Sequence, residues 1–451
     1  MFLRFARVLK EAMTAKNLKA WVVSAEMGYG HHRAVHPFSM LAEREIISVG
    51  RDGAVTPAER KLWNRLLGIY EFFSRARGIP AIGKPVFNIL DTIQRIPSFY
   101  PIRDLSPATY QVDMLASSIR KGLCAGMLNT IGTKQLPLLT SFYAPAIAAD
   151  GAGHEPVYCI ICDADLNRVW VAREPWESRV QYFAPCGRAA QRLKAYGVPE
   201  ERIFLTGFPL PVELLGDSSL SVLKNDLGQR LQHLDPTGRF LGLHGKSVEH
   251  FLGSNQMEEK KERPLTISYA VGGAGAQVGI GVRLARGLAR QIREGTIRLN
   301  LIAGTRAEVN DRFLEVQQEI TPDGKGIQVL YSNSLQEYFD LFNAAMHETD
   351  ILWTKPSELS FFCGLGIPII MAPTIGSHEK FNRQWLHEVQ AGLRQEDLDY
   401  VDQWLLEWLN SGRLAEAAWS GFLKARKLGT YKIIEVLKTG NMERHDSPLL
   451  R

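Results

Sequence analysis

The stretch Ala25-Glu26-Met27-Gly28-Tyr29-Gly30-His31-His32-Arg33-Ala34 decides the fold of the first half of the chain. It follows an apolar run at residues 20–24, which predicts a β-strand, and it precedes a segment with helical spacing. Glycines at a strand-to-helix turn let a ligand approach the backbone closely. The helix that follows directs free N–H groups into the same gap. We therefore expect an α/β domain with a binding crevice at Gly28 and Gly30, and with His31 at its mouth.

A second glycine-rich turn lies in the other half of the chain. The run Gly272-Gly273-Ala274-Gly275-Ala276-Gln277 follows a predicted strand at 265–271 and precedes a helix rich in Leu, Ala and Arg. Such a loop can hold a diphosphate on backbone N–H groups and a helix N-terminus, without a metal ion. The next strand, 299–303, ends without the acidic residue that binds the ribose of NAD, and there is no G-K-[ST] motif. Two such crevices predict two α/β domains that face each other across a shared ligand.

Composition is that of an ordinary globular protein, and the length fits either about three domains or two large ones. The chain has 451 residues, of which 45% are hydrophobic, and a formal net charge of +5. This small charge predicts no nucleic-acid partner, although it fits an anionic ligand or lipid. Cys159 and Cys162 lie in an apolar, strand-like run, so we interpret the five cysteines as buried thiols of a cytoplasmic protein rather than as disulfides or metal ligands. No apolar stretch reaches the ~20 residues that span a bilayer. The basic, amphipathic residues 1–10 predict either a packed leading helix or a membrane-surface helix.

Strands alternate with helices through both halves, which is typical of doubly wound parallel sheets. We expect a first domain at 1–211 with a helical insertion at about 57–127, a linker leading into the second domain at 212–264, a second domain at 265–412, and a helix at 413–438 that packs back on the first. The charge run 258–263 predicts a solvated surface, and the aromatic, proline-broken segment 84–100 predicts either a buried corner or a contact surface for an acceptor or membrane. The predicted strands are 20–24, 136–140, 157–162, 169–171, 180–183 and 202–206, then 265–271, 299–303, 327–330, 351–354 and 368–371, and the second domain also has predicted helices at 335–345 and 358–365.

Two further polar positions follow strands of the second domain. Glu358 comes shortly after the strand at 351–354, and a carboxylate at the end of a strand can accept hydrogen bonds from both hydroxyls of a ribose. Glu379 and Asn382 are three residues apart on the first turn of a predicted helix, so they share one face that suits sugar hydroxyls. The alternative for Glu379 is a first-turn acid that stabilises the helix dipole.

In this order, the motifs resemble those of the inverting glycosyltransferases of GT-B architecture that include the monogalactosyldiacylglycerol synthases and the peptidoglycan N-acetylglucosaminyltransferases. The resemblance covers residues 18–45, 155–211 and 265–395. It rests on GYGHHRA, on Ile161-Cys162-Asp163 with Trp170, on the run YFAPCGRAAQRLKAYGVPEERIFLTGFPL, on VGGAGAQVGIG and on GLGIPIIMAPTIGSHEKFN. Phe361 stands where the family carries its ribose carboxylate, and His378 stands where many members carry glutamine.

The resemblance implies two facing Rossmann-like domains with a cleft between them. It also implies an enzyme that transfers a hexose from a nucleoside diphosphate sugar, expected to be a UDP-sugar, to a lipid or other hydroxyl acceptor with inversion. It implies no cofactor and no metal ion. His31 would be the general base or would orient the acceptor hydroxyl, and Asp163 is a second acid or orienting group. The implied donor ligands are Gly273, Gly275 and Gln277 for the diphosphate loop, Glu358 for the ribose, and His378, Glu379 and Asn382 for the sugar.

Three functions remain open for a protein of this fold. The first is the glycosyltransferase, acting in the cytoplasm with peripheral membrane contact and a glycolipid product. The second is a nucleotide-sugar epimerase of the same architecture, which needs acids near the donor and no acceptor. The third is a non-catalytic protein that binds a nucleotide sugar or lipid, which the displaced position of Glu358 favours.

Overall fold

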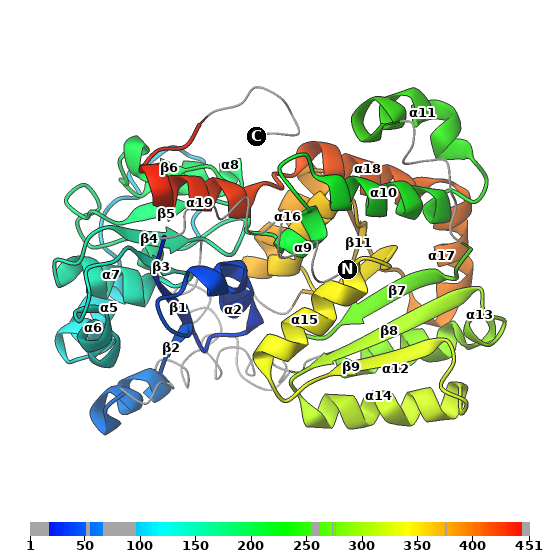
Figure 1. Cartoon of the computed structure of the whole chain (residues 1–451), viewed down its shortest axis with the longest axis horizontal. Helices are drawn as coiled ribbons and strands as arrows, with labels where there is room; N and C mark the ends of the chain where they lie inside the picture. Colours follow the sequence, from blue (N-terminus) through cyan, green and yellow to red (C-terminus); the bar gives the residue numbers. More distant parts are fainter. Residues whose placement is uncertain are drawn as a thin grey trace. The chain divides into compact units, whose positions relative to one another are not determined.

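The computed structural model describes residues 18–50, 55–65, 96–253, 262–272, 275, 277–374 and 377–443, apart from the side chains of residues 377–378. Its contacts divide the chain into two compact units. Unit 1 is formed mainly by Leu210–Pro373 and Arg383–Lys427, and unit 2 by Met13–Pro209, Thr374–Asn382 and Leu428–Arg451. Each unit holds its own parallel sheet, and both sheets are drawn in Figure 1.

Unit 2 contains a six-stranded sheet with the order β2-β1-β3-β4-β5-β6, in which every pair is parallel. All five residues of β1 are buried, as expected for a central parallel strand covered on both faces. The strands are β1 (Trp21–Ala25), β2 (Ile47–Val49), β3 (Leu138–Thr140), β4 (Val157–Ile160), β5 (Gln181–Phe183) and β6 (Ile203–Phe204). The helices whose bounds are described at both ends are α2 (Tyr29–Val35), α5 (Tyr110–Arg120), α6 (Ala125–Ile131), α7 (Tyr143–Gly151), α8 (Gly187–Ala195) and α19 (Gly429–Thr439), with the short 3₁₀ helices η1 (His36–Leu41), η2 (Arg168–Trp170) and η3 (Glu200–Arg202).

Unit 1 contains a second six-stranded parallel sheet, with the order β12-β11-β10-β7-β8-β9. Its strands are β7 (Leu265–Ala270), β8 (Ile297–Gly304), β9 (Ile327–Tyr331), β10 (Ile351–Thr354), β11 (Ile369–Met371) and β12 (Gly392–Arg394). Its helices are α9 (Val212–Leu215), α10 (Ser221–Leu234), α11 (Arg239–Leu252), α12 (Val278–Gly287), α13 (Ala289–Arg293), α14 (Ala307–Ile320), α15 (Leu335–Met346), α17 (Val401–Asn410) and α18 (Arg413–Lys424), with the 3₁₀ helices η5 (Glu358–Leu365) and η6 (Leu398–Tyr400). Helix α16 (Ser377–Glu388) contributes residues to both units.

The predicted fold class is confirmed: the protein is α/β, with two Rossmann-like, doubly wound sheets in separate units. That the two sheets face each other across a cleft stays a prediction. Among the described residues, no helix combines the length and apolar character needed to cross a membrane.

Each sheet has a point at which the strand order reverses. In unit 2 the chain passes from β1 to β2 on one side and then places β3 on the other side of β1. In unit 1 the chain runs β7, β8, β9 in one direction and then places β10 on the other side of β7. Ligands of doubly wound sheets bind outside the carboxyl ends of the strands at such points. The exits of β1 and β3, and those of β7 and β10, are therefore the places to examine for a site.

Two predicted elements have a different conformation in the structure. Residues 169–171 were predicted as a strand, but Arg168–Trp170 form the 3₁₀ helix η2. The buried Arg168 guanidinium donates to the carbonyls of Ser106, Val171 and Ala172, so this segment wraps around one side chain instead of pairing with a strand. The predicted helix at 358–365 is the 3₁₀ helix η5, and the short strand β2 was not predicted.

The segment 212–264 is more structured than a linker. It holds helices α9, α10 and α11, and Leu223, Leu227 and Leu231 of α10 are buried at a spacing of four residues. This spacing gives α10 an apolar face that packs within unit 1. Of the charge run 258–263, which was predicted to be a solvated surface, residues 258–261 lie outside the described residues. Its last residue, Arg263, pairs with the buried carboxylate of Asp350 at 2.7 and 2.8 Å.

The C-terminal part predicted as one helix at 413–438 forms two helices. Helix α18 belongs to unit 1 and α19 belongs to unit 2, which also contains the sheet of the predicted first domain. The break occurs at Ala425, which has the extended angles φ −77° and ψ 142°. Within the predicted helical insertion, residues 57–65, α5 and α6 are helical, whereas residues 66–95 and 1–10 lie outside the described residues.

Candidate functional site

The strand-to-helix turn of unit 2 presents His31 at the carboxyl edge of the sheet. Gly28, which precedes α2, has φ 113°, a conformation that L-residues with a side chain rarely adopt. His31 Nδ1 lies 2.7 Å from the carbonyl oxygen of Ser141, the residue that follows β3. The ring of His31 therefore bridges the exits of β1 and β3, which is the reversal point of this sheet.

This hydrogen bond fixes the tautomer of the His31 ring. A carbonyl oxygen can only accept, so Nδ1 must carry the hydrogen and donate it to Ser141. In the neutral ring the lone pair then resides on Nε2. A histidine whose second nitrogen is fixed by a backbone carbonyl is oriented for acid–base chemistry through the other one. Sequence reasoning identified His31, but it missed the partner that sets its basic nitrogen.

Aromatic side chains surround the His31 ring. Phe142 contacts it edge-on with ring centroids 5.0 Å apart, and Trp170 lies at 6.1 Å. Tyr143 packs against both of these rings, with ring centroids 4.1 Å apart for Phe142 and 5.3 Å apart for Trp170. The 3₁₀ conformation of η2 thus has a consequence for the site, because it is η2 that brings Trp170 to the histidine. Packing on two sides limits the rotation of the imidazole.

The loop after β4 contributes Cys162 to the same place. Its Sγ lies 3.6 Å from His31 Nδ1 and 3.6 Å from the Ser141 carbonyl, to which the thiol donates. All five cysteines of the chain are buried thiols outside any disulfide, as the sequence predicted. Burial also raises the pKa of the neighbouring Cys159 thiol, which keeps that thiol protonated and unreactive at neutral pH.

Asp163, the next residue, is joined to Asn382 of α16. Asn382 Nδ2 donates to Asp163 Oδ1 at 2.8 Å, and the backbone N–H of Ala164 donates to Asn382 Oδ1 at 2.8 Å. Glu379 and Asn382 are both buried, at 1% and 0% exposure, and residues 374–382 group with unit 2 rather than with the predicted second domain. His31, Asp163, Glu379 and Asn382, which the sequence had divided between two domains, therefore all belong to unit 2, where a hydrogen bond joins Asp163 to Asn382.

The glycine loop of unit 1 follows β7, and its described residues are Gly272, Gly275 and Gln277. Gly275 has φ 71°, and its N–H donates to the Gly272 carbonyl at 2.8 Å. Gln277 directly precedes α12, and its side chain donates to the carbonyl of Pro373, beyond the end of β11, at 2.7 Å. The hydroxyl of Tyr269 donates to the Gln277 carbonyl at 2.7 Å. These contacts hold the turn at the carboxyl edge of the sheet. Gly273 lies outside the described residues.

The exit of β10 adds a cation that sequence reasoning did not assign. A methyl group placed on Gly272 would lie 2.6 Å from Cε of Lys355, so the Lys355 side chain runs along the glycine turn. Glu358 follows as the first residue of η5 at the same edge. Phe361, at the position where the resembled glycosyltransferases carry a carboxylate, is 2% exposed and packs on Trp385 with ring centroids 4.8 Å apart, so it belongs to the core. The side chain of His378 lies outside the described residues.

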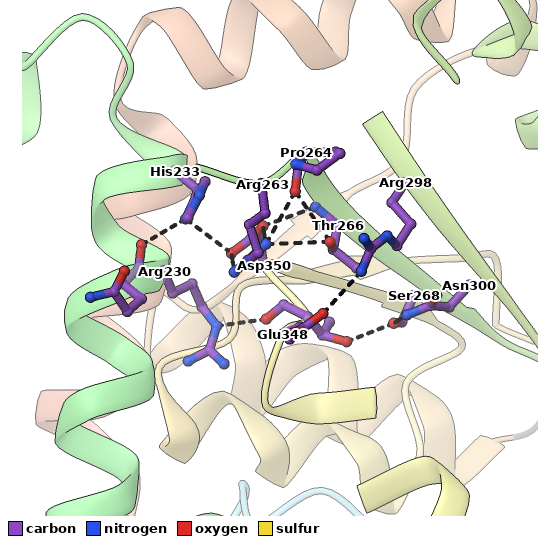
Figure 2. Close-up of polar contacts among 12 residues, drawn as sticks. Arg230, His233, Arg263, Pro264, Thr266, Ser268, Arg298, Asn300, Glu348 and Asp350 are labelled. Carbon is purple, nitrogen blue, oxygen red and sulfur yellow. Dashed lines mark hydrogen bonds and ion pairs between the residues drawn. The ribbon is translucent and has the colours of Figure 1, made fainter. Parts of the chain in front are cut away.

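The opposite edge of this sheet carries a polar network with a structural role. Figure 2 shows Asp350, at the amino end of β10, surrounded by Arg263, His233 and Thr266. The buried Arg230 donates from its three guanidinium nitrogens to carbonyls of residues near the ends of α15 and η5, including Thr349 and Leu365. Because ligands of doubly wound sheets bind at the carboxyl edge, this network stabilises the fold rather than forming a second site. The residues that the structure describes contain no His, Cys, Asp and Glu group suited to a metal ion.

Comparison with known proteins gives one partial family match. A family profile described as "Domain of unknown function (DUF6938)" matches residues 311–435. No curated protein sequence matches the chain.

Several solved structures are similar over most of their length. A putative UDP-N-acetylglucosamine 2-epimerase from Listeria monocytogenes is 13% identical with a TM-score of 0.48, covering 95% of this chain and 99% of its own. MurG of Acinetobacter baumannii is 14% identical with a TM-score of 0.47, covering 93% and 99%. The MnaA–UDP co-structure from S. aureus is 12% identical with a TM-score of 0.47, covering 94% and 96%. All three similarities are distant.

Proposed function

We propose that the protein is an inverting glycosyltransferase that moves a hexose from a UDP-sugar to a hydroxyl acceptor. The observation that carries the proposal is the His31 ring at the reversal point of the unit 2 sheet, with Nδ1 bonded to the Ser141 carbonyl. A fixed imidazole beside a ligand-binding edge suits the removal of a proton from an acceptor hydroxyl. The motif order in the sequence supports the donor class.

In the proposed reaction, Nε2 of His31 takes the proton of the acceptor hydroxyl as the oxygen attacks C1 of the hexose. The bond from C1 to the diphosphate oxygen breaks on the opposite face, so the anomeric configuration inverts and UDP leaves. Backbone N–H groups of the Gly272–Gly275 turn and the N-terminus of α12 would stabilise the charge on the leaving diphosphate. Asp163 would support His31 or orient the acceptor.

The finer assignments belong to the same proposal. Gly273, Gly275 and Gln277 would line the diphosphate site, Glu358 would accept from the ribose, and His378 and Glu379 would face the hexose. The acceptor would be a lipid or another hydroxyl compound bound near Gly28 and Gly30, with the protein in peripheral contact with a membrane. No cofactor other than the nucleotide-sugar substrate is proposed.

An epimerase is the second candidate, favoured by a specific observation. Two acidic side chains of unit 2, Asp163 and the buried Glu379, flank Asn382, which bonds the first and lies one helical turn from the second. Epimerisation of a nucleotide sugar needs acid–base groups near the donor and no acceptor. Incubation with a UDP-sugar alone separates the two activities, since only the epimerase alters the sugar without an acceptor.

The transferase is tested with full-length protein, UDP-glucose, UDP-galactose and UDP-N-acetylglucosamine, with and without diacylglycerol vesicles or soluble alcohols. We expect acceptor-dependent release of UDP and a product whose anomeric configuration is inverted by NMR. His31→Ala should lower turnover by about 10²–10⁴-fold, the usual contribution of a general base. His250→Ala, which removes an exposed imidazole from α11, is the matched control and should keep turnover. Full turnover in His31→Ala would remove the base assignment, and UDP binding without turnover for any acceptor would favour a binding protein.

A further inference from the structure

Asn382 is held in the protein by both ends of its side-chain amide. Its Oδ1 accepts from the Ala164 N–H at 2.8 Å, and its Nδ2 donates to Asp163 Oδ1 at 2.8 Å. The residue is 0% exposed. These two bonds join residues 218 and 219 positions apart in the chain, and they attach the first turns of α16 to the loop after β4.

Only a short side chain with an acceptor and a donor side by side can satisfy both groups. A backbone N–H donates and an ionised carboxylate only accepts, so the 163–164 dipeptide presents opposite demands at adjacent atoms. Aspartate at position 382 would still accept from Ala164, but it would face Asp163 with a second negative charge. Alanine would leave two polar groups without their partner in a buried place, which is costly.

The loop that Asn382 binds is also fixed at its other positions. Cys162 contacts His31 and Ser141, the Ala164 carbonyl accepts from the thiol of Cys186, and Asp165 accepts from Arg188 and Arg192 at 2.8 Å each. Asn382 of α16 holds the remaining two groups of this loop, the Asp163 carboxylate and the Ala164 N–H. The orientation of the Asp163 carboxylate therefore depends on Asn382.

We propose that Asn382 is a positioning residue that fixes the Asp163 carboxylate, rather than a contact to the sugar of the donor. This rests on the proposed function only in giving Asp163 a part in the chemistry. It reassigns a residue that the motif resemblance places on the hexose, because the polar atoms of Asn382 already bind the protein.

The hydrogen-bond arm of the test needs no substrate. Amide hydrogen exchange is measured at Ala164 and across residues 379–382 in four variants. Three are the single variants Asn382→Ala, Asn382→Asp and Asp163→Asn. The fourth is the double variant that combines Asp163→Asn with Asn382→Asp and so swaps the two side chains. We expect exchange about tenfold or more faster in Asn382→Ala, where both bonds are lost. Asp163→Asn should retain protection, because an amide oxygen still accepts from Asn382. The double variant should regain protection that Asn382→Asp loses, since the amide and the carboxylate have changed places.

The kinetic arm separates positioning from sugar binding. Asn382→Ala should lower kcat by about tenfold or more and change the KM for the UDP-sugar by less than about threefold, since positioning acts on the chemical step. The double variant should stay low in kcat even with its protection restored, because its carboxylate is at position 382. Gln384→Ala, an exposed amide on the same helix, is the control and should match the wild type in both arms.

Several results would overturn the proposal. They are unchanged protection at Ala164 in Asn382→Ala, a rise in donor KM with kcat preserved, or recovery of kcat in the double variant. If the wild type turns over no UDP-sugar, the proposed function fails, and hydrogen exchange alone then decides whether Asn382 holds Asp163.

Discussion

At the scale of single residues, the backbone carbonyl of Ser141 determines which ring nitrogen of His31 can accept a proton. His31 could be predicted from its place after two glycines, but Ser141 could not, because the contact joins residues 110 positions apart and any residue type supplies a carbonyl. Cys162 was predicted as a buried thiol and is one, yet its contact with His31 followed from no pattern in the sequence. Residue types that carry chemistry are visible in the sequence, whereas their backbone partners are not.

Glu213 of α9 gives a prediction for the pH dependence of stability. Burial raises the pKa of its carboxyl above the ordinary value of 4.5, even though Asn343 Nδ2 donates to Oε1 at 2.6 Å. The folded state therefore holds the proton more tightly than the unfolded chain, and stability decreases as the pH rises from about 4.5 through the folded pKa. Glu213→Gln removes the ionisable group, and with it the decrease in stability at higher pH. The new side-chain amide can also donate to Asn343 Oδ1, which has no hydrogen-bond partner in the described part of the chain.

We expect urea unfolding to give Glu213→Gln a higher free energy of unfolding than the wild type at neutral pH, with the difference shrinking toward pH 4. Glu315→Gln on α14 is the control, because that side chain is 62% exposed. A benefit of Glu213→Gln that does not decrease with falling pH would show that ionisation of Glu213 is not its source.

At the scale of elements, apolar runs were predicted well and elements organised by polar contacts were not. The central strands β4, β7 and β10 follow from short apolar runs, because parallel strands are buried on both faces. The segment 169–171 has the same apolar appearance, but the buried Arg168 draws the chain around its guanidinium. The helices in 212–252 were missed because polar clusters outweighed the four-residue spacing of the leucines in α10.

The start of α19 gives a prediction for packing. A methyl group on Gly429 would lie 2.2 Å from the Phe208 carbonyl oxygen, and this contact is with backbone, which cannot rotate away. Gly429→Ala should lower the free energy of unfolding by about 1–3 kcal/mol, measured by chemical denaturation. Gly242→Ala in α11 has no atom within 4 Å of the added methyl, and it should raise stability by up to about 1 kcal/mol. Equal effects of the two substitutions would contradict the packing argument.

At the scale of the whole molecule, the sequence predicted two doubly wound sheets because each begins with an apolar strand and a glycine turn. It could not predict that residues 374–382 group with unit 2. Within that segment Asn382 bonds to Asp163 and Ala164, and no local pattern in the sequence encodes this long-range pairing. The donor-side contacts of Glu358, His378 and Glu379 stay predictions, and so does the arrangement of the two sheets around a common ligand.

The proposed use of a nucleoside diphosphate sugar by this chain can be measured by calorimetric titration of UDP into the full-length protein. We expect saturable binding with a Kd at or below about 1 mM, in the range usual for enzyme substrates, and weaker binding of UMP because the glycine turn of unit 1 would hold the second phosphate. The absence of UDP binding at several times that concentration, or equal affinity for UMP and UDP, would contradict the proposed use.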